Sequence, residues 1–385
     1  MLMPFSPAFV RRLLGVALLA LAVIAVLPGA GAAQPAPSAL DVTPTSARYA
    51  TAIDSTEALL DSLRAAQGIP GVTAAVGVNG RIVWSEGFGY ADVENRTPVW
   101  PHTKMRIGSV SKALTSVAVG QLVDDGALDL DAPVQRYVPS FPQKRDTVTT
   151  RLAAGHLAGI RHYRNEEFLS KEHYNSVEAG LDIFEADTLL FEPGTDYSYS
   201  SYGWNLVSAV VEGAADQPFL AYMREHVIRP LNLRHTVADH VDSLITHRGD
   251  YYEREDGSLH NAPYVDNSYK WAGGGYLSTA EDLVRFGHGV HAGTVLDPET
   301  ADLLMTSQRT SDGERTGYGI GWQIDTGPDG RRIVGHGGGS VGGSTAFITI
   351  PSANVVVAII SNMSGVDYGD VPVRIGHQFI QATSQ

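Results

Sequence analysis

Cysteine is absent from the 385-residue chain, and lysine is scarce, with five residues. The lack of thiols excludes disulfide bonds, thiolate zinc sites, cysteine nucleophiles and a lipid-modified amino-terminal cysteine. Basic residues are outnumbered, because 28 lysines and arginines face 42 aspartates and glutamates, which gives a formal net charge of −14. A nucleic-acid surface needs a basic stripe, so we expect no nucleic-acid partner.

Metal and cofactor motifs are also missing. The 13 histidines show no close ligand spacing such as His-Glu-x-x-His, so we predict no metal site. Gly337-x-Gly339-x-x-Gly342 matches the dinucleotide fingerprint in spacing alone, because a strand rather than a helix is expected after it. No Gly-Lys-Ser/Thr phosphate loop occurs, and we predict that the protein works without a cofactor.

The apolar run at residues 13–27, LLGVALLALAVIAVL, is shorter than the ~20 residues that a membrane-spanning helix needs. An arginine pair precedes it, a Pro-Gly pair ends it, and small residues at 30–33 suit cleavage. We therefore predict a signal peptide over residues 1–33, with a retained membrane anchor as the alternative, and a flexible linker over 34–45. The mature protein is expected to be exported, periplasmic or secreted, and to meet a membrane only through its signal segment during export. The Sec and twin-arginine routes both stay open.

Apolar periodicity predicts β-rich segments at both ends of the mature chain and helices between them. Helical spacing covers residues 46–67 and 109–125, and Asn79-Gly80 indicates a hairpin over 72–91. Ser278, with Glu281 three residues later, predicts a capping box at the start of another helix. Strands are expected again at 318–324, 331–339, 344–350 and 354–361, followed by a closing helix.

The simplest architecture pairs the terminal strands in one antiparallel sheet. The predicted fold class is therefore α+β, with the sheet flanked by amino- and carboxy-terminal helices and an inserted, mainly helical lobe. Residues 46–380 would form this domain, with a sheet lobe at about 46–100 and 315–380 and a helical lobe at about 101–314. The cleft between the lobes is the expected ligand site.

Ser109 and Lys112 lie three residues apart at the start of a predicted helix, so both side chains share one face. Serine is a weak nucleophile that needs a neighbouring base. A lysine in a dry cleft loses part of its preference for the charged form and can accept a proton. Free N–H groups at the helix start favour an oxyanion. The pair alone leaves open a helix-start serine beside a solvated lysine.

Two later motifs extend this pattern. Tyr199 and Ser201 form a Tyr-x-Ser unit before a predicted helix, and His336 lies in the glycine-rich stretch GHGGGSVGG. The three motifs in this order resemble the penicillin-recognising serine hydrolases, in particular the branch of class C β-lactamases, D-Ala-D-Ala carboxypeptidases and esterases. Within that branch the chain resembles the mitochondrial serine β-lactamase-like proteins and their bacterial relatives over about residues 50–375. The matching segments are 106–115, 156–163, 191–203, 262–279 and 335–344.

This resemblance implies a β-lactamase/transpeptidase-like fold and a role for each matching residue. Ser109 resembles the acylated nucleophile, Lys112 its proton acceptor, and Tyr199 the residue that handles the proton, while the choice of base between Lys112 and Tyr199 stays open. Ser201 stands where many relatives have asparagine, and its shorter hydroxyl weakens recognition of a substrate amide. His336 stands where a cation often faces a substrate carboxylate or the tyrosine oxygen, and a neutral imidazole weakens binding of carboxylated β-lactams.

The glycine-rich strand edge completes the expected substrate site. By analogy, the backbone N–H groups of Ser109 and Gly339 form the oxyanion hole, with Gly338 beside them in the substrate-binding strand.

Three predictions concern the remaining residues of the matching segments. We expect His156 to pack or to bond to backbone. Arg161, His162 and Tyr163 are expected to form a solvated face, and the alternative is that they line the entrance of the cleft. The segment with Asp266, Asn267, Lys270 and Trp271 runs along the cleft in the family, and a purely structural turn is an equal alternative.

The predicted function is an exported serine hydrolase that works through a Ser109 acyl-enzyme, as a peptidase or amidase on short peptides or as an esterase. Its expected partner is a small-molecule or short-peptide substrate. A class C-like β-lactamase or D-Ala-D-Ala carboxypeptidase is the alternative within the family. A non-catalytic peptide- or cell-wall-binding protein is the alternative from another class, although such a protein does not need the Ser-Lys-Tyr trio. The sequence does not indicate the oligomeric state.

Overall fold

The computed structural model describes residues 47–383, so the predicted signal peptide (1–33) and linker (34–45) lie outside the described residues. The helices are α1 (Ala50–Gln67), α2 (Ser111–Asp124), α3 (Thr150–Ala154), α4 (Ser201–Ala215), α5 (Phe219–Tyr222), α6 (Trp271–Gly274), α7 (Ala280–His291), α8 (Pro298–Leu304) and α9 (Val371–Thr383). The strands are β1 (Gly71–Val78), β2 (Arg81–Asp92), β3 (Thr97–Pro98), β4 (Met105–Arg106), β5 (Val237–Ala238), β6 (Tyr252–Glu255), β7 (Ser258–Asn261), β8 (Tyr276–Ser278), β9 (Gln323–Thr326), β10 (Arg332–Ser340), β11 (Gly343–Ile350) and β12 (Val355–Ser361).

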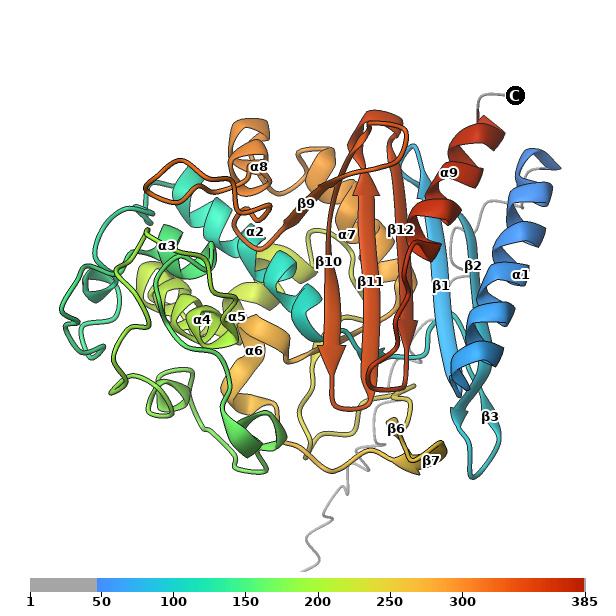
Figure 1. Cartoon of the computed structure of the whole chain (residues 1–385), viewed down its shortest axis with the longest axis horizontal. Coiled ribbons are helices and arrows are strands. Elements are labelled where there is room, and N and C mark those ends of the chain that lie inside the picture. Colours follow the sequence, from blue (N-terminus) through green and yellow to red (C-terminus); the bar gives the residue numbers. More distant parts are fainter. Residues whose placement is uncertain (1–46, 384–385) are drawn as a thin grey trace, which may run out of the picture. The chain divides into compact units, whose positions relative to one another are not determined.

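One sheet in the order β3-β2-β1-β12-β11-β10-β9 brings both ends of the described chain together (Figure 1). β1 pairs antiparallel with β12, from Val72 opposite Ser361 to Val78 opposite Val355. Asn79 and Gly80 join β1 to β2 with φ angles of 52° and 79°, which suits a tight hairpin turn. The expected α+β fold, an antiparallel sheet with terminal helices and an inserted helical lobe, is therefore confirmed.

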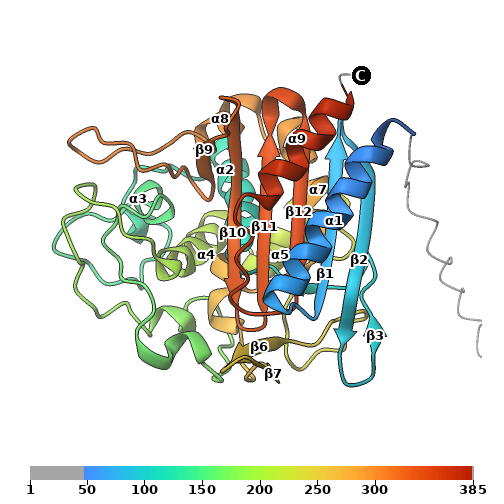
Figure 2. The ribbon, with the colours of Figure 1, turned by 45° about the vertical axis from the view of Figure 1, so that its right-hand side comes forward.

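Helices cover both faces of this sheet. α1 and α9 lie side by side on one face, and α7 packs on the opposite face against β1, β2 and β12 (Figures 1 and 2). Strand β12 is buried along its whole length, and its side chains alternate between two hydrophobic cores. Val357 and Ile359 point toward α1 and α9, whereas Ala358 and Ile360 join the larger core that continues into the helical lobe.

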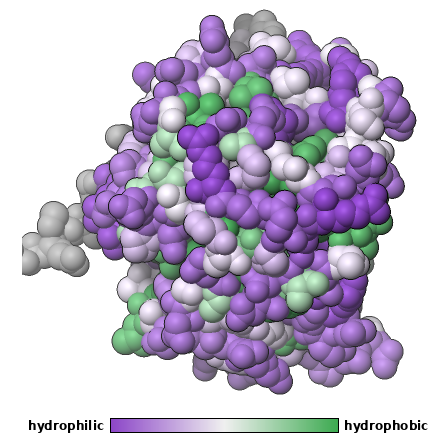
Figure 3. All heavy atoms as spheres, turned by 90° about the vertical axis from the view of Figure 1, so that its left-hand side faces the viewer, coloured by the Kyte–Doolittle hydropathy of each residue, from purple (hydrophilic) through white to green (hydrophobic). Residues whose placement is uncertain are grey.

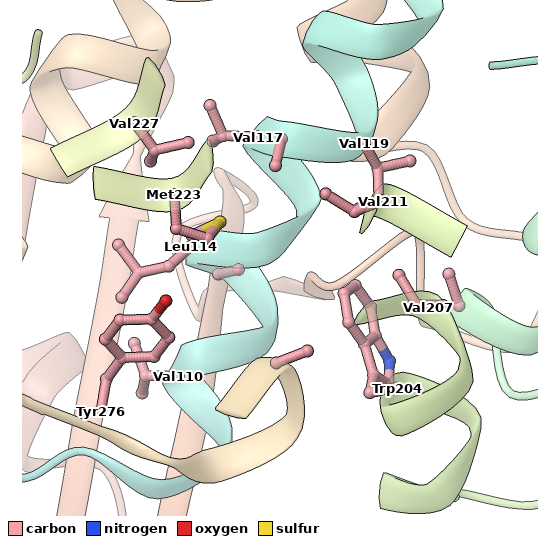
Figure 4. Packing of buried hydrophobic residues seen from close by; sticks show 14 of the residues in the cluster. Val110, Leu114, Val117, Val119, Trp204, Val207, Val211, Met223, Val227 and Tyr276 are labelled. Carbon is pink, nitrogen blue, oxygen red and sulfur yellow. The ribbon is translucent and has the colours of Figure 1, made fainter. Parts of the chain in front are cut away.

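Helix α2 is the centre of the helical lobe. Eleven of its fourteen residues are buried, as expected for a helix that is apolar around its circumference. Figure 4 shows Leu114 and Val117 of α2 beside Met223 and Val227 of the π-helical segment Met223–Ile228, while side chains of α4 pack on another side of the helix. Because α2 is held from several sides, the turn at its amino-terminal end is fixed relative to the sheet.

Two local predictions were wrong. Tyr318, Ile320 and Trp322 alternate as in a strand and are buried, yet β9 begins only at Gln323. The backbone there turns back on itself, because Gly319 N–H donates to the carbonyl of Trp322.

The cap of α7 lies one residue later than predicted, and it is a single N-cap hydrogen bond. Thr279, not Ser278, is the N-cap of α7, and its hydroxyl accepts the backbone N–H of Asp282 at 3.2 Å. Ser278 instead ends β8, and its hydroxyl pairs with that of Thr236.

The face of the molecule in Figure 3 is mostly hydrophilic, and its hydrophobic residues lie in small separate patches. Within residues 47–383, none of the helices combines the length and apolar character needed to cross a membrane.

Candidate active site

Ser109 lies in a single 3₁₀ turn, Gly108–Val110, that leads into α2. The α-helix itself begins at Ser111, two residues later than predicted, because Gly108 adopts a left-handed φ of 50°. The turn packs against β10, so the nucleophile candidate stands between the helical lobe and the edge of the sheet. The side chain of Ser109 is half-buried and faces a cleft of about 550 Å³.

Lys112 is completely buried below Ser109. Its Nζ lies 3.0 Å from Ser109 Oγ, 3.2 Å from Ser201 Oγ and 2.7 Å from the carbonyl oxygen of Gly273. These partners are all uncharged, so nothing in direct contact favours an ammonium ion. Burial, and then the charge of Lys270, lower the pKa of Lys112 well below its usual value. Lys112 is thus prepared to accept a proton from Ser109.

Tyr199 completes the trio that the sequence analysis named. Its hydroxyl interacts with the side chain of Ser109, and Lys112 Nζ lies 4.9 Å from the centre of its ring. Burial raises the pKa of Tyr199, so the phenol keeps its proton at neutral pH. The structure therefore brings Ser109, Lys112 and Tyr199 together, although they come from two segments about 90 residues apart in the sequence.

The ring of His156 packs against the ring of Tyr199, as predicted. Its ring centre lies 4.3 Å from that of Tyr199, and its Nδ1 accepts the backbone N–H of Ser200 at 3.1 Å. Burial lowers the pKa of His156 far below its usual value, so the imidazole is neutral. Its contacts are those of a residue that fixes the start of α4, where Ser201 is placed.

The cleft is formed by both lobes and by the loops around them. Ser109, Tyr199, Ser201 and Gly339 all face it. The lining residues are Ser109, His162, Tyr163, Phe168, Leu169, Tyr199, Ser201, Glu253, Lys270, Gly273, Gly274, Gly339, Ser340, Val341, Ser364 and Gly365. A Cβ atom on Gly339 would meet nothing within 4 Å, so this stretch of β10 leaves room for a bound molecule.

His336 and Gly338 are not among these lining residues. His336 is buried, its Nδ1–H donates to the carbonyl of Gly337, and its Nε2 accepts the Tyr318 hydroxyl at 2.8 Å. Burial, followed by the charge of Lys112, lowers the pKa of His336 to about 3, so this imidazole is not a cation at neutral pH. Gly338 allows close packing, because a Cβ there would lie 2.0 Å from the carbonyl oxygen of Ile107. Their substrate-binding roles stay predictions.

The prediction of a solvated face at Arg161, His162 and Tyr163 was wrong. Arg161 is buried and forms ion pairs with Glu167 and Asp187. His162 and Tyr163 line the cleft, and His162 Nδ1 accepts the backbone N–H of Ser201 at 3.1 Å. The carboxylates of Glu167 and Asp187 compensate the charge of Arg161, which allows this polar segment to be partly buried and to line the cleft.

The segment at 262–279 is both structural and part of the cleft. Asp266 Oδ1 accepts the backbone N–H of Ser268, and Asn267 Nδ2 donates to Asp239, so these two residues shape the turn. Lys270 faces the cleft, and the carbonyl of Gly273 is the shortest contact of Lys112. Sequence reasoning missed this carbonyl, and the three consecutive glycines at 273–275 were the signal for a close backbone approach.

Among residues 47–383 there is no cluster of three or more histidine and acidic side chains that could hold a metal ion. The chemistry available at the cleft is that of a serine hydroxyl, a buried amine and a phenol in mutual contact.

Comparison with known proteins agrees with this geometry. Residues 56–375 match the Beta-lactamase family. The serine beta-lactamase-like protein LACTB of Bos taurus, a mitochondrial protein, is 32% identical over 450 residues, which cover 87% of this chain and 81% of that protein.

Two solved structures have the same fold. The octameric penicillin-binding protein homologue from Pyrococcus abyssi has a TM-score of 0.72 at 24% identity, covering 86% of this chain and 77% of that one. The D-amino acid amidase from Ochrobactrum anthropi has a TM-score of 0.72 at 21% identity, covering 87% and 98%. The chain therefore belongs to the β-lactamase family of serine hydrolases.

Proposed function

We propose that this protein hydrolyses amide or ester bonds of small acyl substrates through a covalent acyl-enzyme on Ser109. The observation that carries the proposal is the 3.0 Å contact between Ser109 Oγ and the buried Lys112 Nζ. A lysine that is merely structural would be expected to keep its charge in water or beside a carboxylate, whereas Lys112 contacts only uncharged groups.

The proposed reaction begins with proton transfer from Ser109 to Lys112. Ser109 Oγ then forms a bond to the substrate carbonyl carbon, and the bond to the leaving amine or alkoxide breaks as the leaving group takes up a proton. Tyr199 keeps its proton in the free protein, because burial raises its pKa, so it is suited to donate toward the leaving group. The proton that Lys112 took from Ser109 then restores Tyr199. Water later attacks the ester on Ser109, and a proton of this water passes through Lys112 to Ser109 Oγ as the acid leaves. Lys112 is accordingly the proposed base of acylation.

The oxyanion of the tetrahedral intermediate is proposed to bind the backbone N–H groups of Ser109 and Gly339. Support comes from the packing of the Ser109 turn against β10 and from the open space beside Gly339. Each such donor contributes about 3 kcal/mol of transition-state stabilisation in acyl-transfer enzymes.

Amide bonds in short peptides are the first choice of substrate, and esters are the second. A neutral, buried His336 cannot supply the cation that binds a β-lactam carboxylate, so we place β-lactamase or D-Ala-D-Ala carboxypeptidase action behind amidase action. D-amino acid amidase, which has the same fold, was solved in complex with L-phenylalanine amide, in line with this order.

Covalent labelling tests the proposal. Wild-type protein is incubated with a fluorophosphonate, and the labelled peptide is identified by mass spectrometry. We expect an adduct on Ser109, its loss in Ser109→Ala, and its retention in Ser111→Ala, which removes the adjacent buried hydroxyl. A panel of p-nitrophenyl esters, D- and L-amino-acid anilides and nitrocefin then ranks the substrates. An unlabelled wild-type protein, beside a control enzyme that labels, would favour the non-catalytic binding protein.

We further propose that the protein is exported and loses residues 1–33. The composition of residues 13–33 supports this proposal. Expression of the full chain in a bacterium, followed by mass spectrometry of the mature amino terminus, should show cleavage near residue 33. A full-length cytoplasmic product would contradict export. Replacement of both Arg11 and Arg12 by lysine blocks export only if the twin-arginine route is used.

A further inference from the structure

A second buried lysine lies in the same cleft as Ser109. Lys270 ends the 3₁₀ turn Ser268–Lys270 that leads into α6, and it lines the cleft. Only 2% of the residue is exposed, and its Nζ has no hydrogen-bond partner. Burial of an ammonium group without an anion destabilises the folded protein, so the presence of Lys270 in the cleft requires an explanation.

Aromatic rings surround this ammonium group. Nζ lies 4.3 Å from the ring centre of Phe168, 5.2 Å from that of Tyr269 and 5.7 Å from that of Tyr163. The faces of such rings attract a cation and hold it in place, but they accept no strong hydrogen bond. The three N–H donors of Lys270 are thus available to a ligand that enters the cleft.

Carboxylates of the protein do not neutralise Lys270. Asp239, the acidic group that favours its charged form, is bound to the buried Arg106 at 2.7 Å. Glu253 lines the same cleft from β6, yet no hydrogen bond joins it to Lys270 Nζ in the described residues 47–383. Lys112, a second buried amine, contacts Ser109 but is not itself one of the residues that line the cleft. Lys270 is thus the lysine among the residues that line the cleft, in a chain that carries a net charge of −14.

We propose that Lys270 is the specificity-determining residue of the cleft, and that it binds a carboxylate carried by the acyl part of the substrate. The inference deepens the proposed function and rests on it, because the anion belongs to the molecule that acylates Ser109. The preferred substrates are half-esters and half-amides of dicarboxylic acids, including acidic residues of short peptides. A carboxylate is an acceptor without donors, an ammonium group is a donor without acceptors, and a hydrogen bond between two such charged groups is shorter and stronger than one between neutral groups.

The electrostatics of Lys270 support this assignment. Burial, and then the charge of Arg106, lower its pKa to about 7, so the amine is partly charged in the free protein at neutral pH. A bound carboxylate favours the charged form. His336, the residue of the motif that could have supplied a cation, is neutral and does not line the cleft.

A matched pair of esters tests the proposal. p-Nitrophenyl valerate and mono-p-nitrophenyl glutarate have acyl chains of equal length, and they differ in a terminal methyl or carboxylate group. For wild-type protein we expect kcat/KM to be higher for the glutarate ester. Lys270→Met should lower the glutarate-to-valerate ratio of kcat/KM at least about tenfold, since it removes one partner of a buried ion pair. Lys171→Met, which changes an exposed lysine, should leave the ratio unchanged. Equal loss on both esters would mean that Lys270 only supports the structure, and would overturn the proposal.

Direct binding separates this proposal from the hydrolase proposal. Calorimetry with Ser109→Ala protein should detect binding of glutarate, and the double variant with Lys270→Met should not bind it. Binding of glutarate by a protein that neither labels at Ser109 nor hydrolyses esters would preserve the Lys270 site and reject the hydrolase mechanism. Hydrolysis without glutarate binding and without preference for the acidic ester would reject the Lys270 site and preserve the mechanism.

Discussion

A Cβ atom placed on Gly108 would lie 2.5 Å from the carbonyl oxygen of Gly339. The turn that carries Ser109 thus touches the backbone of β10 without any side chain between them. This contact joins the helical lobe to the edge of the sheet at the point where the nucleophile and the proposed oxyanion donors have to meet. Gly108 also has a left-handed φ of 50°. Both the close approach to Gly339 and this backbone conformation therefore favour glycine at this position.

Gly108→Ala should therefore impair catalysis far more than an ordinary glycine substitution. The added methyl group separates the Ser109 turn from β10, and misplacement of a reacting group by about 1 Å can cost roughly 100-fold in rate. Gly126→Ala is the matched control, because Gly126 has a φ of 68° but open space around its Cβ position. Fluorophosphonate labelling rates and thermal unfolding of both variants make the comparison. Similar labelling of the two variants would contradict the importance of the contact.

Lys112→Met should slow acylation of Ser109 by a factor of about 10²–10⁴, the usual contribution of a general base. The methionine side chain preserves much of the volume but cannot accept the serine proton. The measurement is the second-order rate of fluorophosphonate labelling, with Lys171→Met as a control at an exposed position. A loss of less than about tenfold would point to Tyr199 as the base instead.

The labelling rate should increase with pH and reach its plateau well below the usual pKa of lysine. Protonated Lys112 cannot accept the serine proton, and burial lowers its pKa, so the active neutral form predominates at a lower pH than for a free amine. His162 and His336 do not add a step near neutrality, because their pKa values are lowered to about 4 and about 3. A labelling rate that continues to increase up to about pH 10 would show that Lys112 is charged in the folded protein.

Lys270→Met should stabilise the fold, by about 1–4 kcal/mol if the gain is similar to that found when buried ion pairs are replaced by apolar residues of similar volume. The folded pKa of about 7 lies below the usual value, so the unfolded chain binds the extra proton between these two values. The destabilisation of the folded wild-type protein by Lys270 is thus greatest below about pH 7, and it decreases as the pH rises toward about 10. Urea unfolding of both proteins at pH 6 and pH 9 tests this, and the stabilisation should be larger at pH 6. A variant that is less stable at both pH values would show that the aromatic cage already compensates the charge.

The sequence predicted the regular elements well where the signal was local. The hairpin at Asn79-Gly80 depends on two adjacent residues that tolerate positive φ, and α1 ends at Gly68 in the left-handed conformation. The strand predicted at 318–324 was wrong because apolar residues at every second position also occur in a turn whose side chains fill the core. Periodicity records which residues are buried, and it does not record how their backbone groups are paired.

For the active site, the sequence by itself determined which side chains could supply the chemistry. The Ser109–Lys112 spacing and the later Tyr199–Ser201 motif named groups that lie in one cleft. Burial was less predictable, because an arginine such as Arg161 reads as solvated until its two carboxylate partners are known. The charge of each group depends on that burial and could not be read from its residue type.

Only the tertiary structure decided what surrounds these groups. It placed the Gly273 carbonyl on Lys112, turned His336 toward Tyr318, and enclosed Lys270 in aromatic rings without a carboxylate. Each of these contacts joins segments that are separate in the sequence and that meet only in the folded chain. Local sequence patterns govern a residue and its near neighbours, whereas the pKa and the free hydrogen-bonding capacity of a buried group depend on every segment packed around it.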